Sequence, residues 1–177
     1  MYQNFQIQNK YMNIDEFSKE YQVRYLKEAD IDDILLVMDT NPQYYDYCKP
    51  SPSRESIISD MNALPPNKTL TDKYYVGYYL DNKLICILDL ISKYPDEKTA
   101  FIGFFMINKN FQNKNRGSFI IKELTEYLKK ESFEKIKLGY VEGNCQSKNF
   151  WLKNGFMPTG TISKQKYYNV VVMNKNI

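Results

Sequence analysis

Histidine is absent from this chain of 177 residues. Imidazole is the common general base near neutral pH and the commonest protein metal ligand, so mechanisms that depend on it are excluded. Any general base has to be a carboxylate, a tyrosine, a chain terminus or water. Cysteine is scarce: Cys48, Cys86 and Cys145 lie far apart without metal-ligand spacing. The sequence therefore predicts free thiols, with neither a disulfide framework nor a metal site.

Long apolar runs are also missing. No run approaches the roughly 18 residues that a membrane span needs, and residues 1–20 lack the apolar segment of a signal peptide. Lys and Arg number 24 against 21 Asp and Glu, a net charge of +3, and the basic residues are scattered among acids. We therefore expect a cytoplasmic protein with no membrane or nucleic-acid partner.

The residues that are present have the composition of a globular protein, with 43% hydrophobic and 25% charged residues. Without an internal repeat or a low-complexity linker, we expect one α/β domain over residues 21–177. It follows an N-terminal extension, residues 1–20, with a short strand and a helical turn. The expected elements are a strand at 21–25, a helix at 29–38, a proline-bounded loop at 40–52, a helix at 53–61, strands at 74–80, 83–91 and 100–107, a helix at 120–128, a strand at 136–140, a helix at 147–152 and a strand at 167–173.

Three features of this pattern predict how the strands pair. Asp81-Asn82 tolerates the positive φ angles of a tight turn, so strands 74–80 and 83–91 should form an antiparallel hairpin. Residues 100–107 are nearly all apolar, as expected of a central strand covered on both faces. The long helical crossover after this strand should return residues 136–140 parallel to it.

The most informative stretch is the polar loop over residues 111–118, between the central strand and the amphipathic helix. A helix N-terminus directs unpaired N–H groups and the positive end of its dipole toward one point, which suits a pyrophosphate. Gly117 allows close backbone approach to an anion, and Lys114 and Arg116 add positive charge. A simple helix cap is the alternative interpretation of this loop.

This loop resembles the acetyl-CoA loop of the GNAT (GCN5-related N-acetyltransferase) family. Gln112 and Gly117 fit its pattern, whereas Asn115 stands at the first glycine position. The context agrees: Asn144 ends the next strand, and Phe150-Trp151 precede Gly155-Phe156. The resemblance implies a mixed, mostly antiparallel twisted sheet with helices on both faces and a splayed parallel strand pair in its centre. It also implies acetyl-CoA as co-substrate, with no metal.

By this resemblance, three groups of residues bind acetyl-CoA. The backbone of the central strand lies along the pantetheine arm, the loop surrounds the pyrophosphate, and residues after the next strand line the far side of the arm. These residues are Phe105, Met106 and Ile107; Gln112, Asn113, Lys114, Asn115, Arg116, Gly117 and Ser118; and Asn144, Asn149 and Trp151. A strand-end turn remains an alternative for Asn144, and a core aromatic for Trp151.

Catalytic and acceptor residues follow from the same resemblance. The Ile107 N–H would polarise the acetyl carbonyl, and Glu142 and Asp89 are candidate bases, although each could be an ordinary carboxylate. Many relatives carry a tyrosine acid at the position of Trp151, whose indole cannot act as one. Tyr44 and Tyr45, with Tyr47, fall where relatives cover the acceptor. The 16 tyrosines of the chain offer composition bias as the alternative explanation.

The sequence thus predicts an N-acetyltransferase that moves an acetyl group from acetyl-CoA directly to a primary amine of a small molecule or peptide. Two alternatives stay open. One is a regulatory or sensor module that binds CoA without turnover, which Asn115 and Trp151 permit. The other is an unrelated α/β binding domain with a coincidental loop. A homodimer is also left open.

Overall fold

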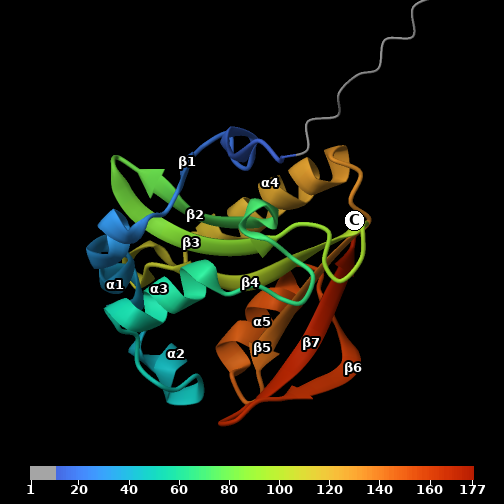
Figure 1. Cartoon of the computed structure of the whole chain (residues 1–177). Helices are drawn as coiled ribbons and strands as arrows, with labels where there is room; N and C mark the ends of the chain where they lie inside the picture. The colour runs from blue at the N-terminus through green and yellow to red at the C-terminus, as the bar shows by residue number, and fades with distance from the viewer. Residues whose placement is uncertain (1–10) are drawn as a thin grey trace, which may run out of the picture.

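The computed structural model describes residues 11–177, which form a seven-stranded sheet with helices packed around it (Figure 1). The strand order is β1-β2-β3-β4-β5-β7-β6, and only β4 and β5 pair in parallel. The mixed, mostly antiparallel sheet and the parallel central pair are therefore confirmed. The strands are β1 (Gln22–Tyr25), β2 (Lys73–Leu80), β3 (Lys83–Ile91), β4 (Thr99–Ile107), β5 (Lys135–Val141), β6 (Met157–Lys164) and β7 (Asn169–Asn176).

Helices cover both faces of the sheet and bury a separate apolar cluster on each (Figure 1). One cluster includes α4 and Trp151 of α5, and the other includes residues of α1 and α3. Strand β4 contributes Ile102 to the first cluster and Met106 to the second, as predicted for a strand covered on both faces. The helices are α1 (Ile31–Asp39), α2 (Pro42–Tyr47), α3 (Arg54–Asn62), α4 (Arg116–Lys130) and α5 (Cys145–Lys153), with 3-10 turns η1 (Ile14–Glu16), η2 (Glu28–Asp30), η3 (Leu70–Asp72) and η4 (Lys109–Phe111).

Local signals in the sequence explain where these elements begin and end. Asp81 and Asn82 take φ angles of 49° and 59°, and this turn joins β2 to β3 in the predicted antiparallel hairpin. The Ser53 side chain accepts a hydrogen bond from the Ser56 N–H and begins α3 as expected. In α4, buried Ile120, Ile121, Leu124, Tyr127 and Leu128 form the predicted apolar stripe.

Two sequence-based expectations were wrong. The segment predicted as a loop over residues 40–52 contains α2, because Pro42 occupies the first turn of the helix, where no N–H is needed. Strand β6 was not predicted at all. Its side chains are almost all exposed, so it lacks an apolar signal, and Pro158 and Gly160 interrupt the pattern further. The last strand, β7, begins at Asn169 and extends to Asn176, further than expected.

The feature that positions the site is the separation of β4 from β5. Within the described residues, the β4–β5 ladder runs only from Thr99 to Ile102 on β4, opposite Lys135 to Leu138 on β5. Strand β5 stays paired with β7 as far as Val141. The second half of β4 therefore faces an opening on its β5 side, which confirms the expected splayed pair.

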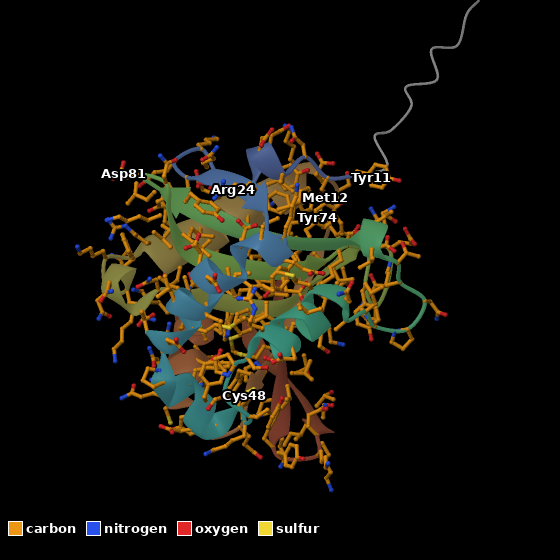
Figure 2. All side chains as sticks on the ribbon, turned by 60° about the vertical axis from the view of Figure 1, so that its left-hand side comes forward. Tyr11, Met12, Arg24, Cys48, Tyr74 and Asp81 are labelled. Carbon is orange, nitrogen blue, oxygen red and sulfur yellow. The ribbon has the colours of Figure 1, made fainter. Side chains whose placement is uncertain are left out.

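The segment before β1 packs on the rest of the molecule. Turn η1 confirms the predicted helical turn, whereas residues 11–20 contain no strand, and residues 1–10 lie outside the described part. The Met12 N–H donates to the Tyr74 hydroxyl at 2.9 Å, and these two residues lie side by side in Figure 2. Phe17 is completely buried. The domain boundary at residue 20 stays a prediction.

Candidate active site

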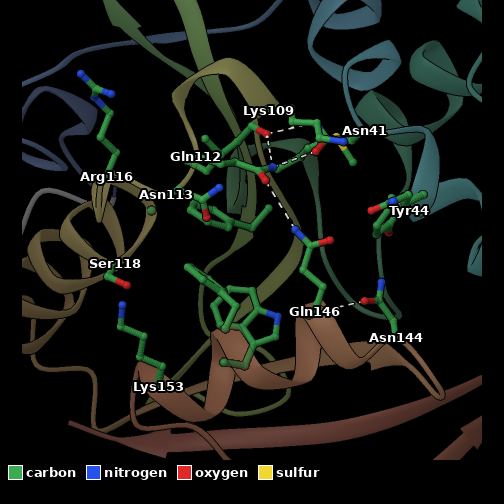
Figure 3. Close-up of a pocket in the computed structure, with 18 of the residues that line it drawn as sticks. Asn41, Tyr44, Lys109, Gln112, Asn113, Arg116, Ser118, Asn144, Gln146 and Lys153 are labelled. Carbon is green, nitrogen blue, oxygen red and sulfur yellow. Dashed lines mark hydrogen bonds between the residues drawn. The ribbon is translucent and has the colours of Figure 1, made fainter.

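A pocket of about 310 Å³ opens where β4 and β5 separate, and we call it the cleft pocket (Figure 3). Its walls come from the α1–α2 junction, the end of β4, residues 109–118 and the inner face of α5. Eleven residues predicted to bind the cofactor line it: Phe105, Met106, Ile107, Gln112, Asn113, Asn115, Arg116, Gly117, Ser118, Asn144 and Trp151. Lys114 and Asn149 do not line it.

The start of α4 forms one end of the cleft pocket. Asn115 has left-handed backbone angles, φ 56° and ψ 6°, and its side chain does not cap the helix. This conformation explains why asparagine can replace the family's glycine here. The first helical bond runs from the Phe119 N–H to the Asn115 carbonyl at 2.9 Å. The preceding amides have no intrahelical acceptor, so this helix end offers donors and a positive dipole to an anion.

Gly117 has a packing role in addition to the role that the sequence suggested. A Cβ at this position would lie 3.1 Å from Cε2 of Phe150 and 3.4 Å from Cγ1 of Ile107. The missing side chain therefore lets α4 pack closely against α5 and β4, and the expected approach of an anion to this backbone stays a prediction.

Gln112 closes the end of β4 with its side chain. Its Nε2 donates to the Ile107 carbonyl at 3.0 Å and to Asn41 Oδ1 at 2.8 Å, and Asn41 Nδ2 donates to the same carbonyl at 3.0 Å (Figure 3). The Asn108 N–H donates a hydrogen bond to the Ile85 carbonyl of β3. Because successive residues of a strand alternate in direction, the Ile107 N–H points away from β3, toward the opening.

Of the two cations expected here, Arg116 lines the cleft pocket and Lys114 does not, whereas Lys109 and Lys153 also line it. In Figure 3, the Arg116 side chain extends away from the pocket, and its guanidinium carbon lies 5.5 Å from the Phe111 ring centroid. Lys153, at the end of α5, reaches toward the α4 N-terminus and donates to Asn115 Oδ1 at 3.0 Å. Lysine in a last helical turn is common as a partner of the helix dipole, so the sequence carried no signal for this role.

Aromatic rings form the floor of the cleft pocket. Phe105 stacks on Phe150 with centroids 5.7 Å apart, and Trp151 contacts both Phe150 and Phe156 edge-on. Trp151 is 5% exposed and belongs to the core cluster, so it is a core aromatic that also forms part of the pocket wall.

The Asn144 side chain accepts a hydrogen bond from the Ser147 N–H at 2.9 Å and caps α5. Its alternative role as a turn residue is therefore present as well.

A second pocket, of about 400 Å³, lies beside the cleft pocket, and we call it the Asp89 pocket. Tyr44 lines both pockets, and neighbouring residues of β4 line one or the other. Predicted residues Tyr45 and Asp89 line the Asp89 pocket, whereas Tyr47 and Glu142 line neither. The Glu142 carboxylate instead accepts from Asn169 Nδ2 at 2.9 Å on the exposed β5–β7 side.

Asp89 is held in a specific arrangement. Its Oδ2 pairs with Lys73 Nζ at 2.8 Å, in an ion pair whose side chains are 13% and 2% exposed. Its Oδ1 is buried without a hydrogen-bond partner in the described structure. Burial raises the pKa of Asp89, and the Lys73 ammonium opposes this effect. Gly103 leaves room for the carboxylate, because a Cβ there would lie 2.8 Å from Oδ2.

The described residues contain no group of three or more Cys, Asp or Glu side chains placed to hold a metal ion. Nor does the described part contain a helix long and apolar enough to cross a membrane.

Solved structures with this fold are numerous. An acetyltransferase from Thermus thermophilus matches with a TM-score of 0.71 at 15% identity, over 89% of this chain and 97% of that one. A Salmonella typhimurium acetyl transferase that modifies the N-terminal serine of ribosomal protein L7/L12 matches at 0.70 and 18% identity, over 91% and 97% of the two chains. The PaiA N-acetyltransferase of Thermoplasma acidophilum, solved with coenzyme A, matches at 0.65 and 18% identity, over 89% and 99%.

Among curated proteins, no sequence matches. The sequence model of the Acetyltransferase (GNAT) family matches residues 34–156, from within α1 to just past the end of α5. The match includes all of β4, the loop that follows it and α4. Sequence and fold thus agree, and the chain belongs to the GNAT acetyltransferase family.

Proposed function

We propose that the protein is an acetyl-CoA-dependent N-acetyltransferase that transfers the acetyl group directly to a primary amine of a small molecule or peptide. The observation that carries this proposal is the pair of adjoining pockets that share Tyr44. The cleft pocket has the features of an acetyl-CoA site, and the Asp89 pocket offers space and a carboxylate for an amine. Two reactants bound side by side react without a covalent enzyme intermediate.

The residues of the cleft pocket fit acetyl-CoA, which supplies an activated acyl group when bound. The free amides at the start of α4, together with Lys153, would hold the pyrophosphate. The β4 backbone from Phe105 to Ile107 would bind the pantetheine arm, and the Ile107 N–H would donate to the acyl carbonyl oxygen.

On the acceptor side, an amine must lose a proton before it can attack. Asp89 is the candidate base that faces a pocket, whereas Glu142 is held at the surface by Asn169. The structurally similar Salmonella enzyme modifies the N-terminal serine of a ribosomal protein. This likeness supports keeping peptide N-termini among the candidate acceptors. A homodimer stays a prediction.

Thermal unfolding with acetyl-CoA, using ATP and NAD as controls, tests the donor site. Saturation at about 100 times the dissociation constant should stabilise the protein by about 2.7 kcal/mol. An amine panel with detection of the released CoA thiol then tests turnover. Equal shifts with all three nucleotides, or no shift, would contradict the acetyl-CoA site.

One observation favours a second candidate, a CoA-binding regulatory module without turnover. Trp151 lines the cleft pocket where many relatives have a tyrosine acid, and indole does not donate a proton to a thiolate. Selective stabilisation by acetyl-CoA without acetylation of any amine would select this candidate.

A further inference from the structure

The Asp89 pocket is enclosed by elements from most of the chain. Its floor comes from β2, β3 and β4, and its walls come from the three helices α1, α2 and α3 and from Tyr168 in the β6–β7 connection. A volume of about 400 Å³ is at the small end of the range for ligand pockets. The pocket therefore fits a small molecule or the end of a longer one.

The inner surface of this pocket carries more negative than positive charge. Asp89 and Asp60 line it from β3 and α3, and Lys73, beside Asp89, supplies one positive charge. Lys73 lies behind Asp89 rather than in the lining, whereas Lys49, on the loop after α2, does line the pocket, and Lys49 and Asp60 are both exposed. With Lys73 already bound to Asp89 Oδ2 and to the Ala63 carbonyl at 3.0 Å, Asp60 is the lining carboxylate that has no ion-pair partner among the described residues.

Two polar atoms at the floor have unused hydrogen-bonding capacity. Asp89 Oδ1 and the Tyr75 hydroxyl are both buried and without a partner among the described residues. A buried acceptor of this kind is costly unless a donor reaches it, and an ammonium group carries three donors. A primary ammonium therefore supplies donors for these two floor atoms and a positive charge for Asp60 on the α3 wall.

The walls are aromatic. Tyr44, Tyr45, Tyr75, Phe104 and Tyr168 line the pocket, and Tyr44 contacts Phe104 edge-on with centroids 5.9 Å apart. A hydrogen bond with the Cys48 side chain, together with burial, raises the pKa of Tyr168 to about 12, and burial raises the pKa of Tyr45. The phenols are therefore neutral at physiological pH. Flat neutral walls favour a flat apolar body, and ring faces attract cations.

We propose that the acceptor bound in the Asp89 pocket is a primary monoammonium compound with a flat apolar body, whose ammonium group is held by Asp89 and Asp60 and whose body packs between the tyrosines. This inference rests on the proposed function, because it assigns the substrate class of the same enzyme. It extends that function by naming the charge and shape that the pocket selects.

The test uses 2-phenylethylamine as the probe, with 2-phenylethanol as its neutral analogue, phenylacetate as its anionic analogue and ethylamine as the amine without a ring. Titration calorimetry on the whole chain saturated with CoA measures each dissociation constant. We expect 2-phenylethylamine to bind at least roughly tenfold more tightly than each analogue. Equal or tighter binding of the alcohol or of phenylacetate would overturn the proposal.

Single substitutions test whether 2-phenylethylamine binds in the Asp89 pocket. Asp60→Asn should weaken 2-phenylethylamine roughly tenfold, and Tyr75→Phe should weaken it less, because it removes one neutral partner. Asp89→Asn should abolish binding, and since it also leaves Lys73 unpaired, its folding is checked by circular dichroism and by retained CoA affinity. Asp33→Asn, an exposed carboxylate of α1 outside both pockets, is the matched control. Unchanged binding in Asp60→Asn and Asp89→Asn would refute the site.

Failure of this inference differs from failure of the proposed function. If the protein binds 2-phenylethylamine with the expected variant effects but acetylates no amine, the ammonium site in the Asp89 pocket is supported and the proposed N-acetyltransferase activity is refuted. If it acetylates neutral or anionic acceptors as readily as this probe, acetyltransferase activity is supported and the proposed substrate class is refuted.

Discussion

Lys153 is a basic side chain that reaches the start of α4 from another helix, α5. Its ammonium lies 3.0 Å from Asn115 Oδ1, although no local pattern marks it as a ligand. The sequence placed this charge on Lys114 and Arg116 instead, because they lie inside the loop. A sequence shows which residues neighbour the loop along the chain, but not that α5 packs against it.

Lys153→Gln should weaken acetyl-CoA binding by about 1 kcal/mol, roughly a fivefold rise in the dissociation constant, because one solvent-accessible charge is lost from the phosphate end. Calorimetry with acetyl-CoA measures the effect. Lys148→Gln, on the same helix but outside both pockets, is the control. Equal affinities for both variants would remove Lys153 from the site.

Among the elements, the junction of α1 and α2 is tied to the end of β4 by Asn41. Its side-chain amide donates to the Val37 and Ile107 carbonyls, both at 3.0 Å, and its carbonyl oxygen accepts from Gln112. Asn41→Ala should lower the free energy of unfolding by about 2 kcal/mol, because it removes several partly buried hydrogen bonds. Urea unfolding measures this loss.

Asn62→Ala provides the comparison, because Asn62 makes one exposed hydrogen bond to Ile58 within its own helix. Its loss should be well below that of Asn41→Ala. Similar losses in the two variants would show that the Asn41 contacts do not hold the α1–α2 junction to β4.

The elements with strong periodicity were predictable, as β4, α4 and the β2–β3 hairpin show. Helix α2 was missed because proline density was taken as a sign of a loop, although Pro42 at the first helical position is compatible with a helix. Strand β6 was missed because hydrogen bonds to β7, rather than an apolar face, define it. Exposed elements of this kind depend on their neighbours, which a local pattern does not reveal.

For the molecule as a whole, the segment before β1 is part of the packed core. Phe17 is fully buried between Tyr74 and Tyr127, with ring centroids 6.0 and 5.1 Å away. Phe17→Ala should therefore lower the free energy of unfolding by about 3 to 5 kcal/mol. Urea unfolding of this variant tests it, with Tyr11→Ala as control because Tyr11 is 53% exposed. A loss below about 1 kcal/mol for Phe17→Ala would show that residues 11–20 are dispensable.

The two pockets differ in how far the sequence could predict them. The cleft pocket follows one continuous unit, β4, loop and α4, so a family resemblance over a short stretch located most of its lining. The Asp89 pocket combines residues from Met38 to Tyr168, on three helices, three strands and the connections between them. Its pairing of Asp89 with Lys73, 16 residues apart on adjacent strands, depends on the register of the hairpin, which the sequence did not specify.

Tyr44 of α2 lines both pockets, so a ligand in either pocket would contact the same side chain. A ligand that fixes Tyr44 from the cleft pocket also shapes the wall that a molecule in the Asp89 pocket meets. Thermodynamic linkage makes this influence reciprocal, so each ligand changes the affinity of the other by the same factor. If both pockets bind the ligands proposed for them, Tyr44 is the side chain through which the two binding events are coupled.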